Sequence, residues 1–384
     1  MGSVRLEPTR VQAWAARSAS AVWNAFDLQL VVYALALAVV GLLMAYTNSG
    51  DTPLATGTTF SRGLVWVALG IVAFAVLAAF DYRWLTTFAW PLYFVNIGLL
   101  GASLVIGDGV GGVARWVTIF GFQFQFSELA KILMIVVVAN WIASRRGTQL
   151  TNLATIVGAV ALVAPSLVLV LAQPDLGTSI VFAAIVVGTL FVAGAGLRWL
   201  LLLLGGAVAS MPLIWAYVLR DYQKQRLISF LDPSADPLGS GYHLLQSQIA
   251  VGSGGLFGRG LTNGTQNQLD FLPVQTTDFA AAILFEELGF IGGVLLLGLF
   301  VGLIWRVLLV GWHSDDPFAL AFAGGLASMI LFQLLINVGM VMGIMPITGI
   351  PLPFVSHGGA SLISIAAGLG ILQSINLRQA RPRW

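Results

Sequence analysis

Ten runs of about 20 apolar residues, separated by polar segments, constrain the fold of this chain more than any other feature. A helix rises about 1.5 Å per residue, so such a run is long enough to cross the hydrocarbon core of a bilayer. The sequence therefore predicts an all-α polytopic membrane protein with about ten transmembrane helices. The expected spans are residues 28–46, 63–80, 87–106, 128–144, 153–172, 178–196, 199–219, 279–304, 318–343 and 358–377.

The composition excludes the main soluble classes of protein. Charged residues make up 9% of the chain and hydrophobic residues 58%, whereas an ordinary soluble domain carries about 25% charged residues. These values exclude a soluble enzyme, a disordered protein and a nucleic-acid binder. The formal net charge is +2, which does not indicate a basic patch for nucleic acid. The absence of cysteine excludes disulfides and thiolate chemistry.

The placement of arginine predicts the orientation in the membrane. Basic residues flank the first and last spans; those at the two ends of the chain are Arg5, Arg10, Arg17, Arg378, Arg381 and Arg383. The positive-inside rule puts this side in the cytoplasm. We expect a cytoplasmic segment at 1–27, which does not resemble a signal peptide, a single transmembrane domain at 28–377 and a cytoplasmic tail at 378–384. The large loop 220–277, between spans seven and eight, is then extracytoplasmic.

With this orientation, most ionisable residues near the ends of spans lie at the external face, whereas the cytoplasmic side carries mostly arginines that set orientation. The external set is Asp108, Arg115, Glu128, Lys131, Asp175, Asp278, Glu286 and Glu287. Ionisable groups within spans are costly and commonly mark function. Catalysis or binding is therefore expected to face outward.

Three basic or paired positions suit an anionic substrate. Glu128 and Lys131 are spaced i,i+3 at the start of the fourth span, so they share one helix face. They predict either a structural ion pair that neutralises two costly charges, or a pair in which Lys131 also faces an anion. Arg115 fits an interfacial anchor beside Trp116, or a phosphate clamp, because guanidinium binds phosphate bidentately.

Four acidic positions lie near the outer ends of spans, and two of them have two interpretations each. Asp175 and Asp278 each precede a span and fit an N-cap of the helix that follows. Each also fits a carboxylate in an external cavity, where Asp278 is suited to act as a general base. Glu286 and Glu287 are adjacent and project from different helix faces, so we expect at most one of them to face a given cavity.

Three further segments depart from simple spans. Gly252–Gly260 lacks the ending of a phosphate-binding loop, so close backbone packing or a hinge is the favoured interpretation. A short helix is expected over Gly241–Ile249. Three prolines between Pro346 and Pro353 forbid a continuous helix, and irregular backbone at membrane depth must line a cavity or be buried in protein. His357 follows alone, which argues against a metal ligand.

Seven sequence blocks, in order, resemble the SEDS family (shape, elongation, division and sporulation) of bacterial peptidoglycan glycosyltransferases. The blocks are Phe126–Lys131, Gln173–Gly177, Asp221–Arg226, Gly239–Gly260, Phe271–Pro273 with Thr277–Phe279, Glu286–Gly289 and Pro346–Gly359. The resemblance covers nearly the whole chain from about residue 28 onward. Gly241–His243 and Asn263–Leu269 are similar to the elongation branch, the RodA type. The division branch, the FtsW type, is the close competitor.

The resemblance implies a polymerase of lipid II, the undecaprenyl-pyrophosphate-linked disaccharide peptide, at the outer face of the bacterial cytoplasmic membrane. It implies that Asp278 is the catalytic aspartate. The substrate-binding candidates are Arg115, Glu128, Lys131, Asp175 and Ser356, of which Glu128 and Lys131 match the family's ion pair. The implied partners are a class B penicillin-binding protein and other membrane proteins of the elongation complex.

Three positions depart from the usual pattern of the family. Val274 stands where an acidic residue is usual, Phe126 where proline is common and His357 where tyrosine is frequent. The change at Val274 puts a catalytic role for that position in doubt. It leaves Asp278 as the stronger candidate.

The expected reaction is glycosyl transfer in which Asp278 removes or orients a proton of the acceptor hydroxyl. Arg115, Lys131 or a divalent cation, Mg²⁺ or Mn²⁺, would stabilise the departing pyrophosphate. No nucleotide is required, because the lipid pyrophosphate is already an activated leaving group. A lipid II flippase or transporter, and a non-catalytic scaffold for the penicillin-binding protein, are the alternatives. The sequence leaves open which cation acts and whether the growing glycan chain or lipid II is the donor.

Overall fold

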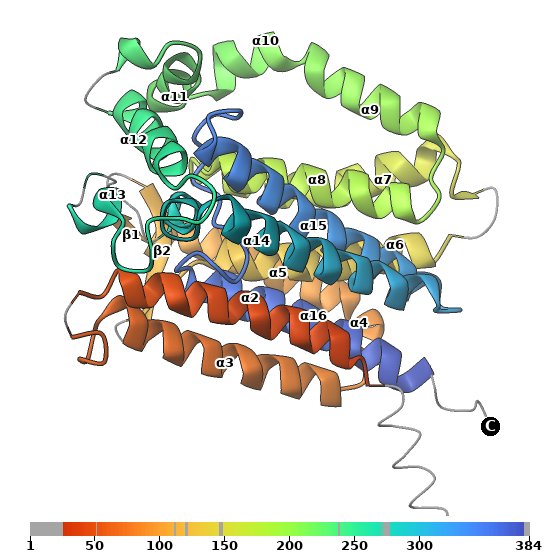
Figure 1. Ribbon diagram of the computed structural model, residues 1–384. Helices are drawn as coiled ribbons and strands as arrows, with labels where there is room; N and C mark the ends of the chain where they lie inside the picture. The colour runs from red at the N-terminus through yellow and green to blue at the C-terminus, as the bar shows by residue number, and fades with distance from the viewer. Residues whose placement is uncertain are drawn as a thin grey trace, which may run out of the picture.

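The computed structural model describes residues 26–50, 52–110, 113–119, 122–145, 149–236, 239–269, 271 and 277–379. It is a bundle of long helices that lie side by side along a common direction (Figure 1). The described chain begins and ends at the same end of this bundle (Figure 1), which we call the termini end. The opposite end carries the long loops and is called the loop end.

Helices of transmembrane length dominate the structure and confirm the all-α polytopic prediction. Within the described ranges, nine helices are long and apolar enough to cross a membrane. They are α2 (Leu28–Thr47), α3 (Thr59–Ala79), α5 (Ala89–Ile106), α6 (Phe126–Ala143), α7 (Leu153–Ala172), the continuous run Leu197–Val218, α14 (Ala280–Trp312), α15 (Pro317–Val341) and α16 (Gly359–Gln379). A tenth apolar helix, α8 (Leu176–Val192), is shorter at 17 residues.

The centre of the bundle is formed by α6, α8, α15 and α16. In the apolar windows of α6 and α16, 67% and 78% of the residues are buried, against 17% in α3. Small residues permit this close approach. A Cβ on Gly325 of α15 would lie 2.7 Å from the hydroxyl of Thr189 on α8 and 2.9 Å from the side chain of Ile135 on α6.

The run Leu197–Val218 lies at the periphery. It consists of α9 (Leu197–Ala209), α10 (Met211–Leu213) and a short π-helix, η2 (Ile214–Val218). Only 6% of its apolar window is buried, and Figure 1 shows α9 and α10 arching along the edge of the bundle. Its surface is therefore available to lipid.

The loop end carries structure that the hydropathy pattern did not specify. An antiparallel sheet is formed there by β1 (Asp108–Val110), β2 (Val113–Ile119) and β3 (Phe122–Phe124). The long loop folds into α11 (Asp221–Leu231), the 3-10 turn η3 (Pro233–Ala235), α12 (Ser240–Ser253) and α13 (Thr265–Gln268). Helix α12 confirms the short helix expected over 241–249. Figure 1 shows α11 and α12 beside the loop end of α14 and α15.

Helix α14 is broken at Gly289, whose φ of 65° is non-helical. The glycine-rich segment 252–260 fills the break with four backbone hydrogen bonds. Arg259 N and Gly260 N donate to the carbonyls of Glu286 and Glu287, and the N–H groups beyond the break, at residues 290 and 291, donate to carbonyls 255 and 256. Buried backbone groups must be paired. This contact confirms close backbone packing as the role of the segment.

The arginines at the termini end do more than set orientation. Arg306 of α14 forms a 2.6 Å ion pair with Asp27, which itself caps α2. Arg378 of α16 pairs with Asp81 at 3.4 Å and donates to the last carbonyls of α3.

Tyr82, beside the short helix α4 (Arg83–Thr87), donates to Asp316 at 2.8 Å. Burial, reinforced by Asp316, raises the pKa of Tyr82 to about 12. These contacts tie helices distant in sequence.

The break in α14 is testable by replacing Gly289 with alanine. The residue has positive φ, and a Cβ there would lie 2.2 Å from the backbone nitrogen of Gly258. Backbone with φ 65° and ψ −162° is adopted almost only by glycine and costs another residue about 1–3 kcal/mol, and displacement of the glycine-rich segment adds to this. We expect Gly289→Ala to lower the thermal unfolding temperature in detergent by several degrees.

The matched control is Gly298→Ala on the same helix, where a Cβ would meet nothing within 4 Å. This variant should unfold at the wild-type temperature or slightly above it. Equal unfolding temperatures for the two variants would contradict the packing assigned to the break.

Candidate functional site

Asp278 lies at the loop end, two residues before α14. The N-cap position of α14 is occupied by Phe279, which makes no side-chain cap hydrogen bond, and not by Asp278. The cap interpretation of Asp278 is therefore wrong. Its carboxylate instead approaches the loop that joins α15 to α16: Oδ2 is 3.5 Å from the position that a Cβ on Gly349 would take. The residue is half-buried, as suits a carboxylate at the wall of a cavity.

Arg226 of α11 approaches the same glycine from the long loop. Its Nη1 lies 3.9 Å from the Cβ position of Gly349. A guanidinium and the Asp278 carboxylate thus flank one residue whose φ is +72°. Glycine adopts this conformation without strain, and both charged groups lie within van der Waals distance of the position that its Cβ would take. The pair combines a proton acceptor with a group suited to phosphate.

Helix α11 is docked onto the turn between α7 and α8. The hydroxyl of Tyr222 donates to the carbonyl of Pro174 at 2.6 Å, and the amide of Gln223 donates to the same carbonyl at 3.4 Å. The guanidinium of Arg226 lies 5.8 Å from the ring centroid of Tyr222, within the range of cation–π attraction. These contacts fix the guanidinium relative to the bundle.

Asn337 of α15 connects the start of α14 to the α15–α16 loop. Its amide nitrogen donates to the carbonyl of Asp278 at 3.0 Å and to the carbonyl of Ile350 at 2.8 Å. The loop also packs on the start of α8, where a Cβ on Gly177 would lie 2.7 Å from the carbonyl oxygen of Thr348. The starts of α8 and α14, helix α11 and this loop therefore meet at one place.

Asp175 is a helix cap in this structure. Its carboxylate accepts from the backbone N–H of Thr178 at 3.0 Å, from the hydroxyl of Thr178 at 2.9 Å and from the side-chain amide of Gln125 at 3.1 Å. The residue is buried. The first of its two interpretations, an N-cap of α8, is confirmed. The contact with Gln125 also joins the start of α6 to the start of α8.

Glu128 and Lys131 form the ion pair that their spacing predicts. The distance between Lys131 Nζ and Glu128 Oε1 is 2.7 Å, and the two side chains are 3% and 2% exposed. Oε2 of Glu128 has no hydrogen-bond partner among the residues that the structure describes. A buried pair with an unsatisfied oxygen is costly, so a hydrogen bond from substrate or water to this atom would be favourable.

Glu286 and Glu287 both face the segment that follows the glycine-rich turn. A Cβ on Gly264 would lie 2.9 Å from Oε2 of Glu286 and 3.3 Å from Cγ of Glu287. The chain of the long loop thus folds against both, and the expectation that at most one of them faces a given cavity stays a prediction. Oε1 of Glu286 accepts from the backbone of Gln266 at 3.1 Å and from the hydroxyl of Thr265 at 3.2 Å. Glu286 thus anchors α13.

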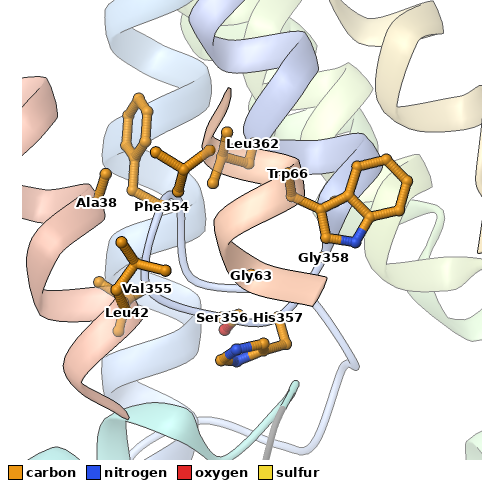
Figure 2. A pocket seen from close by; sticks show the side chains of 13 residues that line it. Ala38, Leu42, Gly63, Trp66, Phe354, Val355, Ser356, His357, Gly358 and Leu362 are labelled. Carbon is orange, nitrogen blue, oxygen red and sulfur yellow. The ribbon is translucent and has the colours of Figure 1, made fainter. Parts of the chain in front are cut away.

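Ser356 does not join the group around Asp278. Its hydroxyl accepts from the backbone N–H of Leu352 at 2.8 Å and so closes a turn in the α15–α16 loop. Figure 2 shows Ser356 and His357 at a small pocket between α2 and α3, with Trp66 across it. Neither Asp278 nor Arg226 lines this pocket.

Two further predictions from the sequence concern Arg115 and a bound metal ion. The backbone of Arg115 lies in β2, but its side chain falls outside the described part. No group of three or more His, Asp or Glu residues is arranged to hold a metal ion within the described ranges. These residues do not fit a metal centre built from protein ligands.

His243 of α12 adds a titratable group beside the site. Its ring centroid lies 6.3 Å from that of Phe279, next in sequence to Asp278. Burial lowers the pKa of His243, the positive charge of Arg226 lowers it further, and Asp236 opposes both. His243 is therefore neutral at pH 7.

Sequence reasoning missed Arg226 and Asn337 as individual site residues. Arg226 was noted only within the block 221–226, although its i,i+4 spacing from Tyr222 puts both on one face of a helix. Asn337 is an amide inside an otherwise apolar span, and polar residues at such positions commonly have a specific partner. The partner itself could not be read from the sequence.

Variants of the Glu128–Lys131 pair in α6 distinguish a structural role from a role in activity. Removing one partner of a buried pair leaves an uncompensated charge and costs about 3–5 kcal/mol. We expect Glu128→Gln and Lys131→Met each to lower the unfolding temperature strongly, and the double variant to recover much of that loss. If Lys131 also faces substrate, the double variant will recover stability and still lack activity. Recovery of both would assign the pair to structure alone.

The neutral state of His243 predicts a pH dependence. Its pKa is below the ordinary 6.5, so below about pH 6.5 the unfolded chain binds a proton that the native chain resists, and native stability falls. The unfolding temperature should fall between pH 7.5 and pH 5.5, and this fall should be smaller for His243→Gln than for wild type. An equal drop in the two proteins would contradict the environment described for His243.

Comparisons with known proteins agree with this architecture. The profile of a family described as cell cycle protein, covering FtsW, RodA and SpoVE, matches residues 28–381. The chain is 40% identical to peptidoglycan glycosyltransferase MrdB of Escherichia coli strain K12 over 354 residues, which is 91% of this chain and 93% of that protein.

Two solved structures are also similar. A chain of a peptidoglycan synthase complex that coordinates polymerization and crosslinking superimposes with a TM-score of 0.78 at 31% identity, over 93% of this chain and 99% of that chain. The rod shape determining protein RodA of Thermus thermophilus gives a TM-score of 0.69 at 28% identity, over 94% and 99% of the two chains.

Proposed function

The chain belongs to the cell cycle protein family of FtsW, RodA and SpoVE, and from this premise we propose that it is a peptidoglycan glycosyltransferase that polymerises lipid II during cell elongation. The observation that carries the proposal is the approach of the Asp278 carboxylate and the Arg226 guanidinium to Gly349. A base beside a phosphate-binding cation is what transfer from a lipid pyrophosphate requires.

In the proposed reaction, the 4-hydroxyl of the acceptor sugar attacks the anomeric carbon of the donor. The new bond joins that oxygen to the anomeric carbon, and the bond from the anomeric carbon to the pyrophosphate oxygen breaks. The proton of the hydroxyl passes to the Asp278 carboxylate, and undecaprenyl pyrophosphate leaves with the bonding electrons. The transition state resembles an oxocarbenium ion, so a nearby carboxylate also stabilises its positive charge.

The departing pyrophosphate needs positive charge in a site of low water content. Arg226 supplies a guanidinium held by its docked helix, and Lys131 supplies an ammonium beside Glu128. Arg115 is retained as a candidate from the sequence. Because no cluster of three or more His, Asp or Glu residues is found in the described part of the chain, a divalent cation such as Mg²⁺ or Mn²⁺ would depend on the phosphates of the substrate for most of its coordination.

The protein is multi-pass, and we propose that it resides in the bacterial cytoplasmic membrane with both termini in the cytoplasm. The loop end then faces outward, on the side of the growing wall. Similarity to a chain of a synthase complex that coordinates polymerization and crosslinking supports a class B penicillin-binding protein as partner. Such a partner would supply the crosslinking activity.

The proposal is tested with purified protein and lipid II, with and without the class B partner. Glycan strands resolved on a gel are the expected product. Lipid II that crosses a vesicle bilayer without being polymerised would instead indicate a flippase. Polymer that forms with the partner alone, at the same rate without this chain, would contradict a glycosyltransferase here.

The role of Asp278 is tested in the same assay. Asp278→Ala and Asp278→Asn should lower polymerisation by at least about 100-fold, the usual contribution of a general base, with unchanged expression and partner binding. The control is Asp232→Asn, an exposed acid of the same loop, which should polymerise normally. Polymerisation by Asp278→Ala within a few-fold of wild type would refute the assignment.

A further inference from the structure

The side chain of Asn337 joins two backbone segments that belong to no helix. It lies in the last third of α15 and is fully buried, at 0% exposure. Its Nδ2 donates both of its hydrogen bonds to carbonyls of irregular backbone, one at Asp278 and one at Ile350. A single amide group thus fixes the backbone of the acid relative to the loop that carries Gly349.

The side chain of Asn337 acts as a hydrogen-bond donor. Oδ1 of Asn337 has no hydrogen-bond partner among the described residues, so the amide oxygen contributes nothing that offsets its burial. An apolar side chain of similar size would fill the same space without that cost. What an apolar side chain could not do is satisfy two buried carbonyls at once. The two N–H groups are therefore what this position supplies.

We propose that Asn337 is a positioning residue for glycosyl transfer, acting through Asp278. By holding the peptide of Asp278 against that of Ile350, it sets where the carboxylate lies beside Gly349 and Arg226. The inference rests on the proposed function, which makes Asp278 the base. A displacement of the reacting groups by about 1 Å can cost on the order of 100-fold in rate, so loss of the amide should lower the rate of the chemical step.

The first experiment measures kcat and KM for lipid II. Asn337→Leu removes both donors while keeping the number and branching of side-chain heavy atoms, and kcat should fall at least tenfold while KM stays within twofold. Asn337→Gln keeps the amide on a longer stem, and it should retain more activity than Asn337→Leu. This second variant also answers the question if Asn337→Leu does not fold. A rise in KM with kcat unchanged, in either variant, would overturn the proposal.

The matched control is Gln333→Leu, four residues earlier on α15. Gln333 is equally buried, and neither of its amide atoms has a hydrogen-bond partner within the described ranges. Gln333→Leu thus also removes a buried amide from α15, and it should leave kcat within twofold of wild type. A fall equal to that of Asn337→Leu would show that packing of α15, rather than the position of Asp278, is at stake.

A second readout does not depend on activity. Because the chain has no cysteine, a single spin label can be attached at Thr277→Cys, next to Asp278. The label should be restrained in the parent and in the Gln333→Leu background, and clearly more mobile with Asn337→Leu. Equal mobility in all three proteins would overturn the proposal, even if kcat had fallen.

Failure of this inference and failure of the proposed function give different results. If Asp278→Asn polymerises normally, the acid is not the base and the positioning role falls with it. If Asp278→Asn is inactive while Asn337→Leu keeps a normal kcat, the proposed function stands and only the role of Asn337 is refuted.

Discussion

The need to pair every buried backbone group determines how the loop end of this protein is built. A membrane offers no water to a broken helix, so each break must find partners inside the protein. The break of α14 at Gly289 is paired by four backbone hydrogen bonds from segment 252–260. The proline-interrupted loop after α15 is held by the amide of Asn337 and by its packing on Gly177. These contacts fold the long loop down onto the bundle.

The same contacts bring charged groups together that lie far apart in sequence. Arg226 comes from the long loop, Asp278 from the start of α14 and Gly349 from the next irregular loop. Helix α11 is held by the carbonyl of Pro174 at the turn before α8. Pairing of the backbone thus brings a carboxylate and a guanidinium to the same glycine. The opposite end is closed by ion pairs between helices and holds no comparable arrangement in the part that the structure describes.

The sequence predicted the helices well because apolar length alone determines them. It also predicted the Glu128–Lys131 pair, since i,i+3 spacing fixes which side chains meet. It did not predict the sheet of β1, β2 and β3, the break at Gly289 within an apolar run, or the approach of both Glu286 and Glu287 to Gly264. Each of these depends on tertiary contacts with distant segments. The approach of Arg226 and Asp278 to Gly349 is of the same kind, and the family resemblance indicated the acid but not the geometry around it.

The central claim is that the reaction takes place at the loop end, beside Asp278, on the outer side of the membrane. A membrane-impermeant thiol reagent added to sealed, right-side-out vesicles tests it, because the chain has no cysteine of its own. Thr277→Cys should polymerise lipid II until the bulky charged reagent modifies it, and then stop. Asp315→Cys, exposed at the termini end, should be protected and stay active. Undiminished polymerisation by fully modified Thr277→Cys would contradict the account.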